Sequence, residues 1–206
     1  MDNVTRRQGF TPSRRKHLIE VPVLSTDNLG GIAADYVRRV RPQAERELDH
    51  YRLAKTDAEA VSEAARCVSV DADGRSRRHP HQRRIPARAI NEAERRLNRS
   101  VHRLRAARNF ADLHDLVESM IGGIHMVGEL TVYDVSLRVG ARFGLAPAEV
   151  YLHRGTREGA VALGLNGRRN TIRVDELPVE FRVLQPRELE DLLCIYKEQL
   201  KRLRRR

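Results

Sequence analysis

The stretch MIGGIHMVGELTVYDVSLRVGARFGL, residues 120–145, holds a short glycine-containing connection between two segments of helical character. Apolar side chains in residues 110–121 recur at the spacing of one helix face, and Gly122 and Gly123 end that segment. After the connection IHMVGE, residues 130–143 are apolar on most faces, and Gly144 follows them. This pattern predicts an amphipathic helix, a tight turn and a buried second helix.

The turn resembles the helix-hairpin-helix motif of DNA-binding proteins. In that motif, glycine lets backbone N–H groups approach a phosphate at the positive N-terminus of the second helix. The usual apolar-Gly-apolar-Gly pattern is only partly kept, because Met126 stands where the first glycine is expected. The resemblance marks these candidate DNA contacts: His125, Met126, Val127, Gly128 and Thr131. A plain helical hairpin with one glycine is the alternative interpretation.

The stretch VYLHRGTREGAVALGL, residues 150–165, resembles the segment that follows the hairpin in endonuclease III-like DNA glycosylases. The resemblance to this helix-hairpin-helix superfamily covers roughly residues 109–165 and implies excision of a base from DNA. Tyr151 occupies the place of the family's catalytic aspartate, and Leu130 stands where some members carry a catalytic lysine. The same resemblance makes Arg154 and Arg157 candidates for phosphate contacts.

A glycosylase without the usual aspartate needs another carboxylate near the sugar. Asp134 is our first candidate, since a carboxylate on an otherwise apolar helix requires either a function or a partner, such as Arg138 four residues on. His153 is a candidate to orient Asp134 or a phosphate, with a satisfied buried histidine as the alternative. Three other acids remain open: Glu129, which is also explained as a helix cap, and Asp191 with Glu190, which a solvated helix face explains more simply.

The charge pattern favours a polyanionic partner. The chain carries 39 Lys and Arg against 28 Asp and Glu, and residues 75–108 alone hold twelve Arg and two Glu. Within this stretch, HPHQRR at 79–84 follows turn signals and is expected to be an exposed loop. Its candidate DNA contacts are His81, Gln82, Arg83 and Arg84. A solvated basic loop is the alternative.

The remaining pattern predicts an all-α helical bundle with little or no sheet. We expect a basic N-terminal arm over 1–28, a helical region with an Arg-rich loop and helix over 29–108, and the hairpin region with a C-terminal helix over 109–206. Pro42 is expected to kink or restart the helix that begins near Ile32, and Thr156 is a candidate N-cap. Helices are also expected to start near Asp57, at Pro86 and at Pro186.

Several classes of protein lose support. His79 and His81 lack a third ligand at suitable spacing, and Cys67 and Cys194 match no zinc pattern, so we expect no metal and reduced thiols. Motifs for nucleotide phosphates or dinucleotides are absent, and we expect no cofactor. No apolar run approaches membrane-spanning length, which predicts a cytoplasmic protein. The sequence therefore predicts a protein that binds double-stranded DNA and excises a modified or unusual base, with a non-catalytic DNA-binding module as the alternative.

Overall fold

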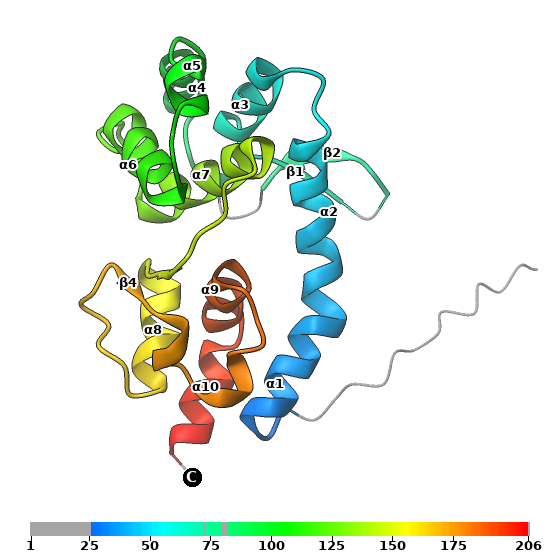
Figure 1. The fold of residues 1–206 in the computed structure, drawn as a ribbon, viewed down its shortest axis with the longest axis vertical. Coiled ribbons are helices and arrows are strands. Elements are labelled where there is room, and N and C mark those ends of the chain that lie inside the picture. The colour runs from blue at the N-terminus through cyan, green and yellow to red at the C-terminus, as the bar shows by residue number, and fades with distance from the viewer. Residues whose placement is uncertain (1–25, 72, 80–81, 206) are drawn as a thin grey trace, which may run out of the picture.

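The computed structural model describes residues 26–71, 73–79 and 82–205, and this part of the chain is mostly helical. Figure 1 shows two lobes, one above the other, with a long helical rod running beside both. The helical fold class is confirmed, and two short two-stranded sheets add a little β structure. Residues 1–25 of the expected N-terminal arm lie outside the described residues.

The upper lobe of Figure 1 has its own hydrophobic core, to which buried residues between Tyr51 and Val139 contribute. Its helices are α3 (Asp57–Ala65), α4 (Ala87–Asn98), α5 (Val101–Arg105), α6 (Phe110–Ile121) and α7 (Glu129–Phe143). Helix α7 packs against α3 and α6 and also against α2 of the rod. Because neighbouring helices surround it, α7 is apolar on most faces, as the sequence predicts.

The lower lobe combines both ends of the described chain around a second core. It contains α1 (Leu29–Asp35), α8 (Arg154–Ala162), α9 (Pro186–Ile195), α10 (Lys197–Arg204), the strands β3 (Val150–Tyr151) and β4 (Thr171–Ile172), and two 3₁₀ turns, Val174–Glu176 and Val179–Phe181. The upper lobe is therefore inserted between two pieces of the lower lobe. The boundary expected at residues 108–109 falls inside the upper core.

The helical rod joins the lobes, because Tyr36 is buried in the lower core and Tyr51 in the upper core. It consists of α1, a π-helical turn (Tyr36–Val40) and α2 (Arg41–Arg52). Pro42 has no N–H to donate, and the Arg41 N–H just before it donates to the carbonyl of Tyr36, five residues back. The irregularity expected at Pro42 is thus a π-helical turn that precedes the proline.

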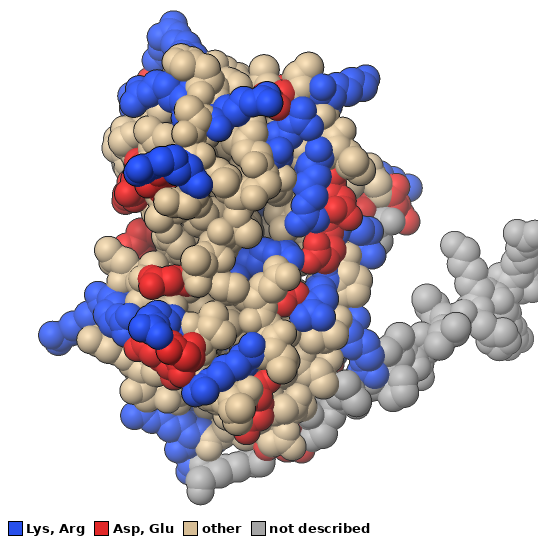
Figure 2. Space-filling model, viewed as in Figure 1, with Lys and Arg blue, Asp and Glu red and all other residues tan. Residues whose placement is uncertain are grey.

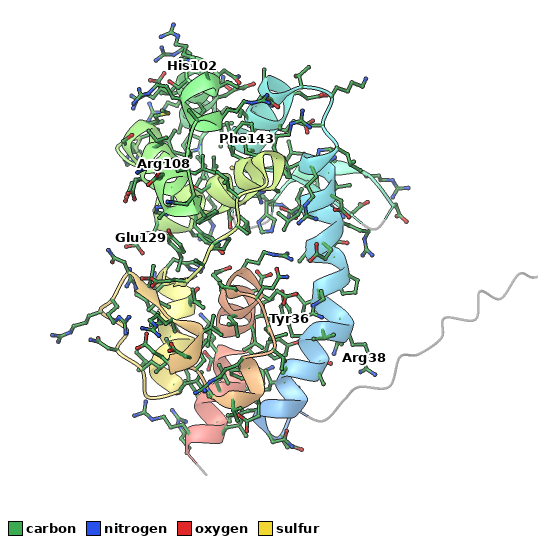
Figure 3. All side chains as sticks on the ribbon, in the orientation of Figure 1. Tyr36, Arg38, His102, Arg108, Glu129 and Phe143 are labelled. Atoms are coloured by element: carbon green, nitrogen blue, oxygen red, sulfur yellow. The ribbon has the colours of Figure 1, made fainter. Side chains whose placement is uncertain are left out.

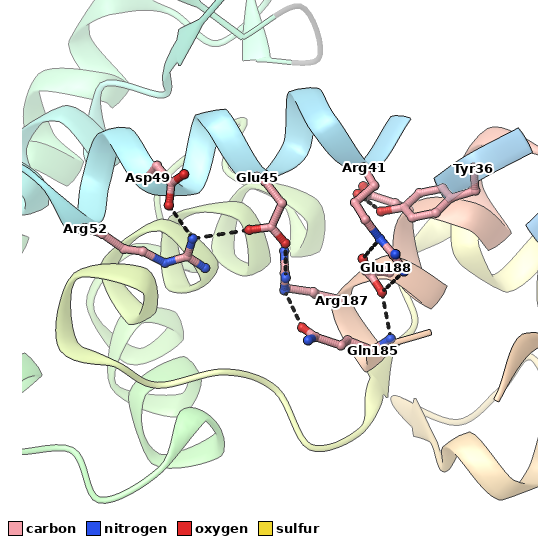
Figure 4. A network of polar contacts seen from close by, with 9 residues as sticks. Tyr36, Arg41, Glu45, Asp49, Arg52, Gln185, Arg187 and Glu188 are labelled. Carbon is pink, nitrogen blue, oxygen red and sulfur yellow. Dashed lines mark hydrogen bonds and ion pairs between the residues drawn. The ribbon is translucent and has the colours of Figure 1, made fainter. Parts of the chain in front are cut away.

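Ion pairs fasten this rod to α9 (Figure 4). Arg41 Nε donates to Glu188 Oε1 at 2.5 Å, and Arg187 donates to Glu45. Glu188 also accepts a hydrogen bond from the backbone N–H of Gln185 at 2.9 Å, which caps the start of α9. These contacts fix the angle between α2 and α9, two of the elements that line the site described below.

The structure corrects several local expectations. The turn-rich stretch that precedes residues 79–84 is not only loop, because β1 (Val68–Val70) pairs antiparallel with β2 (Ser76–Arg78). The helix expected from Pro86 is divided into α4 and α5, and the C-terminal helix is divided at Tyr196 into α9 and α10. Thr156 is a buried residue within α8, whose N-cap is His153. No helix in the described part of the chain is long and apolar enough to span a bilayer.

Candidate functional site

A cavity of about 480 Å³ lies between the lobes and is lined by residues of the rod, α7 and α9. Its volume is in the range of small-ligand pockets. Four carboxylates line it: Glu47, Asp134, Glu190 and Asp191. Arginine side chains from all three elements also reach it: Arg39, Arg138 and Arg187. A basic chain thus encloses an acidic group of side chains at the junction of its lobes.

Asp134 faces this cavity from α7, but its partner is not the one expected. The side-chain amide of Gln82 donates to Asp134 Oδ2. Arg138 instead directs Nε and Nη2 to Glu47 Oε1, at 3.1 and 2.9 Å. The expectation of an Asp134–Arg138 hydrogen bond on one helix is therefore wrong, because a carboxylate from α2 takes the guanidinium.

Gln82 is only 1 % exposed, so it does not lie on the surface of a basic loop as the sequence predicted. Its backbone N–H donates to the His79 carbonyl at 3.0 Å, and its side-chain amide meets the Asp134 carboxylate. Arg83 and Arg84 are exposed, and neither forms an ion pair with any residue in the described ranges. His81, the fourth candidate in this stretch, lies outside the described residues.

His153 is 4 % exposed, its side-chain hydrogen bonds are to the lower lobe, and its ring lies 6.4 Å from that of Tyr133 on α7. Its Nε2 bonds to Glu190, and Thr156 Oγ1 lies 2.7 Å from the same nitrogen. Thr156 also donates to Glu190 Oε1 at 3.1 Å. The expected contact of His153 with Asp134 is therefore replaced by a buried hydrogen-bonded group, and Glu190 does not lie on a solvated helix face.

Glu190 and Asp191 of α9 have raised pKa values, which favours their protonated forms. Burial is the main cause that raises the pKa of Asp191 well above its ordinary value, and the charge of Glu190 raises it further. Burial likewise raises the pKa of Glu190, although its hydrogen bond with His153 opposes this. Tyr36 donates to Asp191 Oδ2 at 3.1 Å. The cavity therefore holds a carboxyl group, Asp191, that keeps a proton to a higher pH than a solvated aspartate does.

The turn before α7 borders a second hollow of about 530 Å³, lined by Gly128, Arg154 and Lys197 among others. Leu130, His153 and Cys194 line both hollows, so the turn and the carboxylate cavity adjoin. Gly128 is exposed and is the N-cap of α7. In the first turn of α7 the Thr131 N–H donates to the Gly128 carbonyl at 2.9 Å, so the N–H groups of Glu129 and Leu130 mark the positive end of the helix dipole.

The other candidates in the turn differ in exposure. Met126 has φ +70°, the left-handed conformation that favours glycine, at the position where the related motif has glycine. The side chains of His125 and Met126 are exposed, whereas Val127 and Thr131 are buried. Direct DNA contact through the Thr131 side chain is therefore disfavoured, and the exposed backbone at Gly128 remains the accessible part of the turn.

The two arginines of α8 are placed differently. Arg154 is exposed beside the hollow at Gly128. Arg157 reaches back across the lobes, where its Nη2 donates to both oxygens of Glu129 at 3.1 and 3.2 Å, and its Nη1 donates to the carbonyl of Arg169. Arg154 is thus available to an anion, whereas Arg157 is already occupied. Glu129, the alternative acid, lies in this exposed pair and does not line the carboxylate cavity.

Most of the Arg-rich helix lies far from the cavity. Figure 3 places His102 at the upper end of the upper lobe and Glu129 near the junction of the lobes. Lys and Arg side chains gather over that upper end in Figure 2. Several of these arginines are already paired, for example Arg95 and Arg96 with Glu92. The cations beside the cavity, rather than this distal group, are therefore the ones that can act at the site.

A third hollow, of about 250 Å³, lies on another side of α7 and includes Tyr151. His114, Asp115 and Glu118 of α6 line it, with their ligand atoms within 4.8 Å of one another, so these three could hold a metal ion. Asp115 and Glu118 are exposed, and exposed acidic groups of this kind are common in proteins without a metal. Tyr151 therefore does not occupy the carboxylate cavity, which Leu130 does line.

Sequence reasoning missed Glu47 and misjudged Glu190. A signal for Glu47 is present, because Val40, Ala44 and Glu47 share one face of the helix that lines the cavity. Glu190 gives a weaker signal, since only the packing of α9 against α8 shows that its face is covered. Comparisons with protein-family models, curated proteins and solved structures found no match to the chain. The functional argument accordingly rests on the geometry of the chain itself.

Proposed function

We propose that this protein binds double-stranded DNA at the turn before α7 and hydrolyses the N-glycosidic bond of a modified or unusual base held between the lobes. The observation that carries the proposal is the junction of two hollows. One is lined by an exposed glycine, by Arg154 and by Lys197, which also pairs with Glu158, and the other contains Asp134 and a carboxyl with a raised pKa, Asp191. The first suits a phosphate and the second suits bond cleavage.

The order of residues along α7 matches the order of groups in a nucleotide. An α-helix rises about 1.5 Å per residue, so Asp134 lies roughly 9 Å beyond Gly128, and Arg138 roughly 6 Å further. With the phosphate at the N-terminus of α7, the sugar comes beside Asp134 and the base reaches the depth of Arg138. A nucleotide rotated out of the duplex presents these groups in this sequence.

The reaction needs a group that tolerates positive charge on the sugar. As the bond between C1′ and the base nitrogen breaks, its electron pair leaves with the base, and the sugar becomes oxocarbenium-like. The Asp134 carboxylate stabilises that charge and accepts a proton from the water whose oxygen bonds to C1′. Asp191 donates its proton to the departing base. Asp134 then releases its proton to solvent, and Asp191 takes one up from solvent. The net change is the addition of one water across the glycosidic bond.

The proposal requires that Gln82 holds Asp134 in position for catalysis, and not that Asp134 serves only as a structural partner of Gln82. The hydrogen bond from the Gln82 amide fixes the rotamer of the Asp134 carboxylate, which is what an electrostatic catalyst needs. The same hydrogen bond also fits the alternative in which Asp134 is structural and the chain only binds DNA. Catalysis, rather than binding, therefore separates the two functions.

The experiment is a screen for abasic sites. Duplexes that contain unmodified, oxidised, alkylated, deaminated or hypermodified bases are incubated with the protein, and alkali-induced strand breakage is measured beside equilibrium binding to the same duplexes. Breakage on at least one duplex supports the glycosylase. Binding with every duplex left intact supports the non-catalytic module, and absence of binding contradicts both.

A further inference from the structure

Three residues that are linked to Asp134 by a hydrogen bond or by the chain each carry a buried polar atom without a partner. In the described part of the chain, Gln82 Oε1, Tyr133 Oη and Arg138 Nη1 are all buried and lack a hydrogen bond. Gln82 is the residue that holds Asp134, and Tyr133 and Arg138 belong to the same helix. Buried polar groups are almost always paired, and leaving one unpaired costs about 1–3 kcal/mol. Such a cluster indicates that a polar ligand completes the site.

Arg138 is the one of the three residues that lines the carboxylate cavity. It is 3 % exposed, and Glu47 holds it through Nε and Nη2. Ser69 Oγ donates to the other oxygen of Glu47 at 2.8 Å, which fixes the carboxylate as well. The guanidinium is therefore rigid, with the N–H groups of Nη1 left over as donors that cannot become acceptors.

We infer that Arg138 is a specificity-determining residue that donates a hydrogen bond to a carbonyl oxygen on the extruded base. This inference rests on the proposed function, in which the base lies at the depth of Arg138. Bases differ there in a simple way: guanine, hypoxanthine, thymine and uracil carry a carbonyl at C6 or C4, whereas adenine and cytosine carry an amino group. Two donors facing each other repel, so Arg138 selects oxo bases and rejects amino bases.

The test compares two bases at a time that differ in the oxo or amino group and in protonation of the ring nitrogen beside it. Duplexes carry hypoxanthine or adenine, or uracil or cytosine, each opposite an abasic spacer so that extrusion breaks no base pair. A 2′-fluoro group on the target nucleotide blocks cleavage, and fluorescence anisotropy gives the affinity. The wild-type chain should prefer the oxo base of each pair by about tenfold or more, the scale of one hydrogen bond to a charged donor.

The variants are chosen to keep the fold. Arg138→Met alone leaves the Glu47 carboxylate unpaired, so Arg138→Met is combined with Glu47→Gln. The double variant should bind duplexes but lose the preference for oxo bases. If it does not fold, as judged by circular dichroism and thermal melting, Arg138→Lys is measured instead. Lysine keeps the charge but not the planar fork, and should reduce the preference severalfold.

The outcomes are distinct. Equal affinity of wild type for oxo and amino bases overturns the inference. Failure of wild type to bind all of the duplexes also overturns it. A preference that persists unchanged in the double variant, or in Arg138→Lys where the double variant is unfolded, also overturns it. A preference that depends on Arg138 supports the inference even if the protein cleaves no natural substrate. Absence of cleavage would contradict only the proposed chemistry.

Discussion

Replacing Gly159 by alanine should destabilise the lower lobe strongly. Gly159 lies on α8 where that helix meets α9, and a Cβ there would overlap the carbonyl oxygen of Leu193 and lie 2.8 Å from its carbonyl carbon. Both atoms belong to backbone, so no change of side-chain rotamer relieves the clash. The helices would have to separate by roughly 1 Å, and overpacking that displaces backbone costs about 3 kcal/mol, the upper part of the usual range.

Gly123→Ala is the matched control, because a Cβ at that position has no heavy atom within 4 Å and Gly123 has no positive φ. It should leave stability unchanged or raise it by up to ~1 kcal/mol, since alanine restricts the unfolded chain. Urea unfolding followed by circular dichroism measures both variants. If Gly159→Ala costs less than ~1 kcal/mol, the close approach of α8 and α9 is wrong, and so is the position of His153 and Glu190 that depends on it.

Three further predictions concern charge and the turn. Reversing the charge of Arg83 and Arg84 should weaken binding to all DNA sequences alike. The slope of log affinity against log salt should fall by about 0.9 for each phosphate that is no longer neutralised. An unchanged slope contradicts a role for these two arginines in binding phosphates. Gly128→Glu should abolish DNA binding without changing the melting temperature, because a Cβ there meets no heavy atom within 4 Å; normal binding would mean that the turn does not approach a phosphate. Asp191→Asn should raise the free energy of unfolding at pH 7 by about 1 kcal/mol. The raised pKa means that ionised Asp191 destabilises the folded state. The gain should therefore vanish below about pH 3, where the carboxyl is protonated in both states, and urea unfolding at pH 7 and at about pH 3 measures this.

The sequence predicts α6 and α7 well because their apolar side chains repeat at helical spacing and glycines mark their ends. Gly122 follows α6, and Gly144 ends α7 with φ +72°. Tertiary packing did not change the helices that these strong local signals predict. For the same reason the N-terminus of α3, where Thr56 accepts a hydrogen bond from the Glu59 N–H, agrees with the helix expected from Asp57.

Other elements carried signals that the pattern did not resolve. Val68–Val70 and Ser76–Arg78 are only three residues each, so their alternation is too short to distinguish a hairpin from a loop. The breaks at Ser100 and Tyr196 interrupt helices whose apolar stripe continues on both sides. Helical periodicity cannot locate such breaks, because the apolar positions are consistent with one helix or with two.

The sequence predicted Asp134 as a residue of the site but did not predict the residues that contact it. Asp134 stands out because it is a carboxylate on an otherwise buried helix, and it does line the cavity. Its partner Gln82 is 52 residues away in sequence, and Arg138 meets a carboxylate 91 residues away. Contacts of this range depend on how the rod and the lobes pack, which no local pattern contains. The DNA-binding and catalytic roles of these residues stay predictions.

The most direct test of the central claim is the rate of abasic-site formation by Asp134→Asn on a duplex that wild type cleaves, measured beside its affinity for the same duplex. Asparagine is nearly isosteric but cannot carry the negative charge, so the rate should fall by about a hundredfold or more while affinity changes little. Asp115→Asn is the control, because that carboxylate is 81 % exposed and lines a different hollow. Wild-type cleavage that Asp134→Asn retains in full would contradict the account of this site.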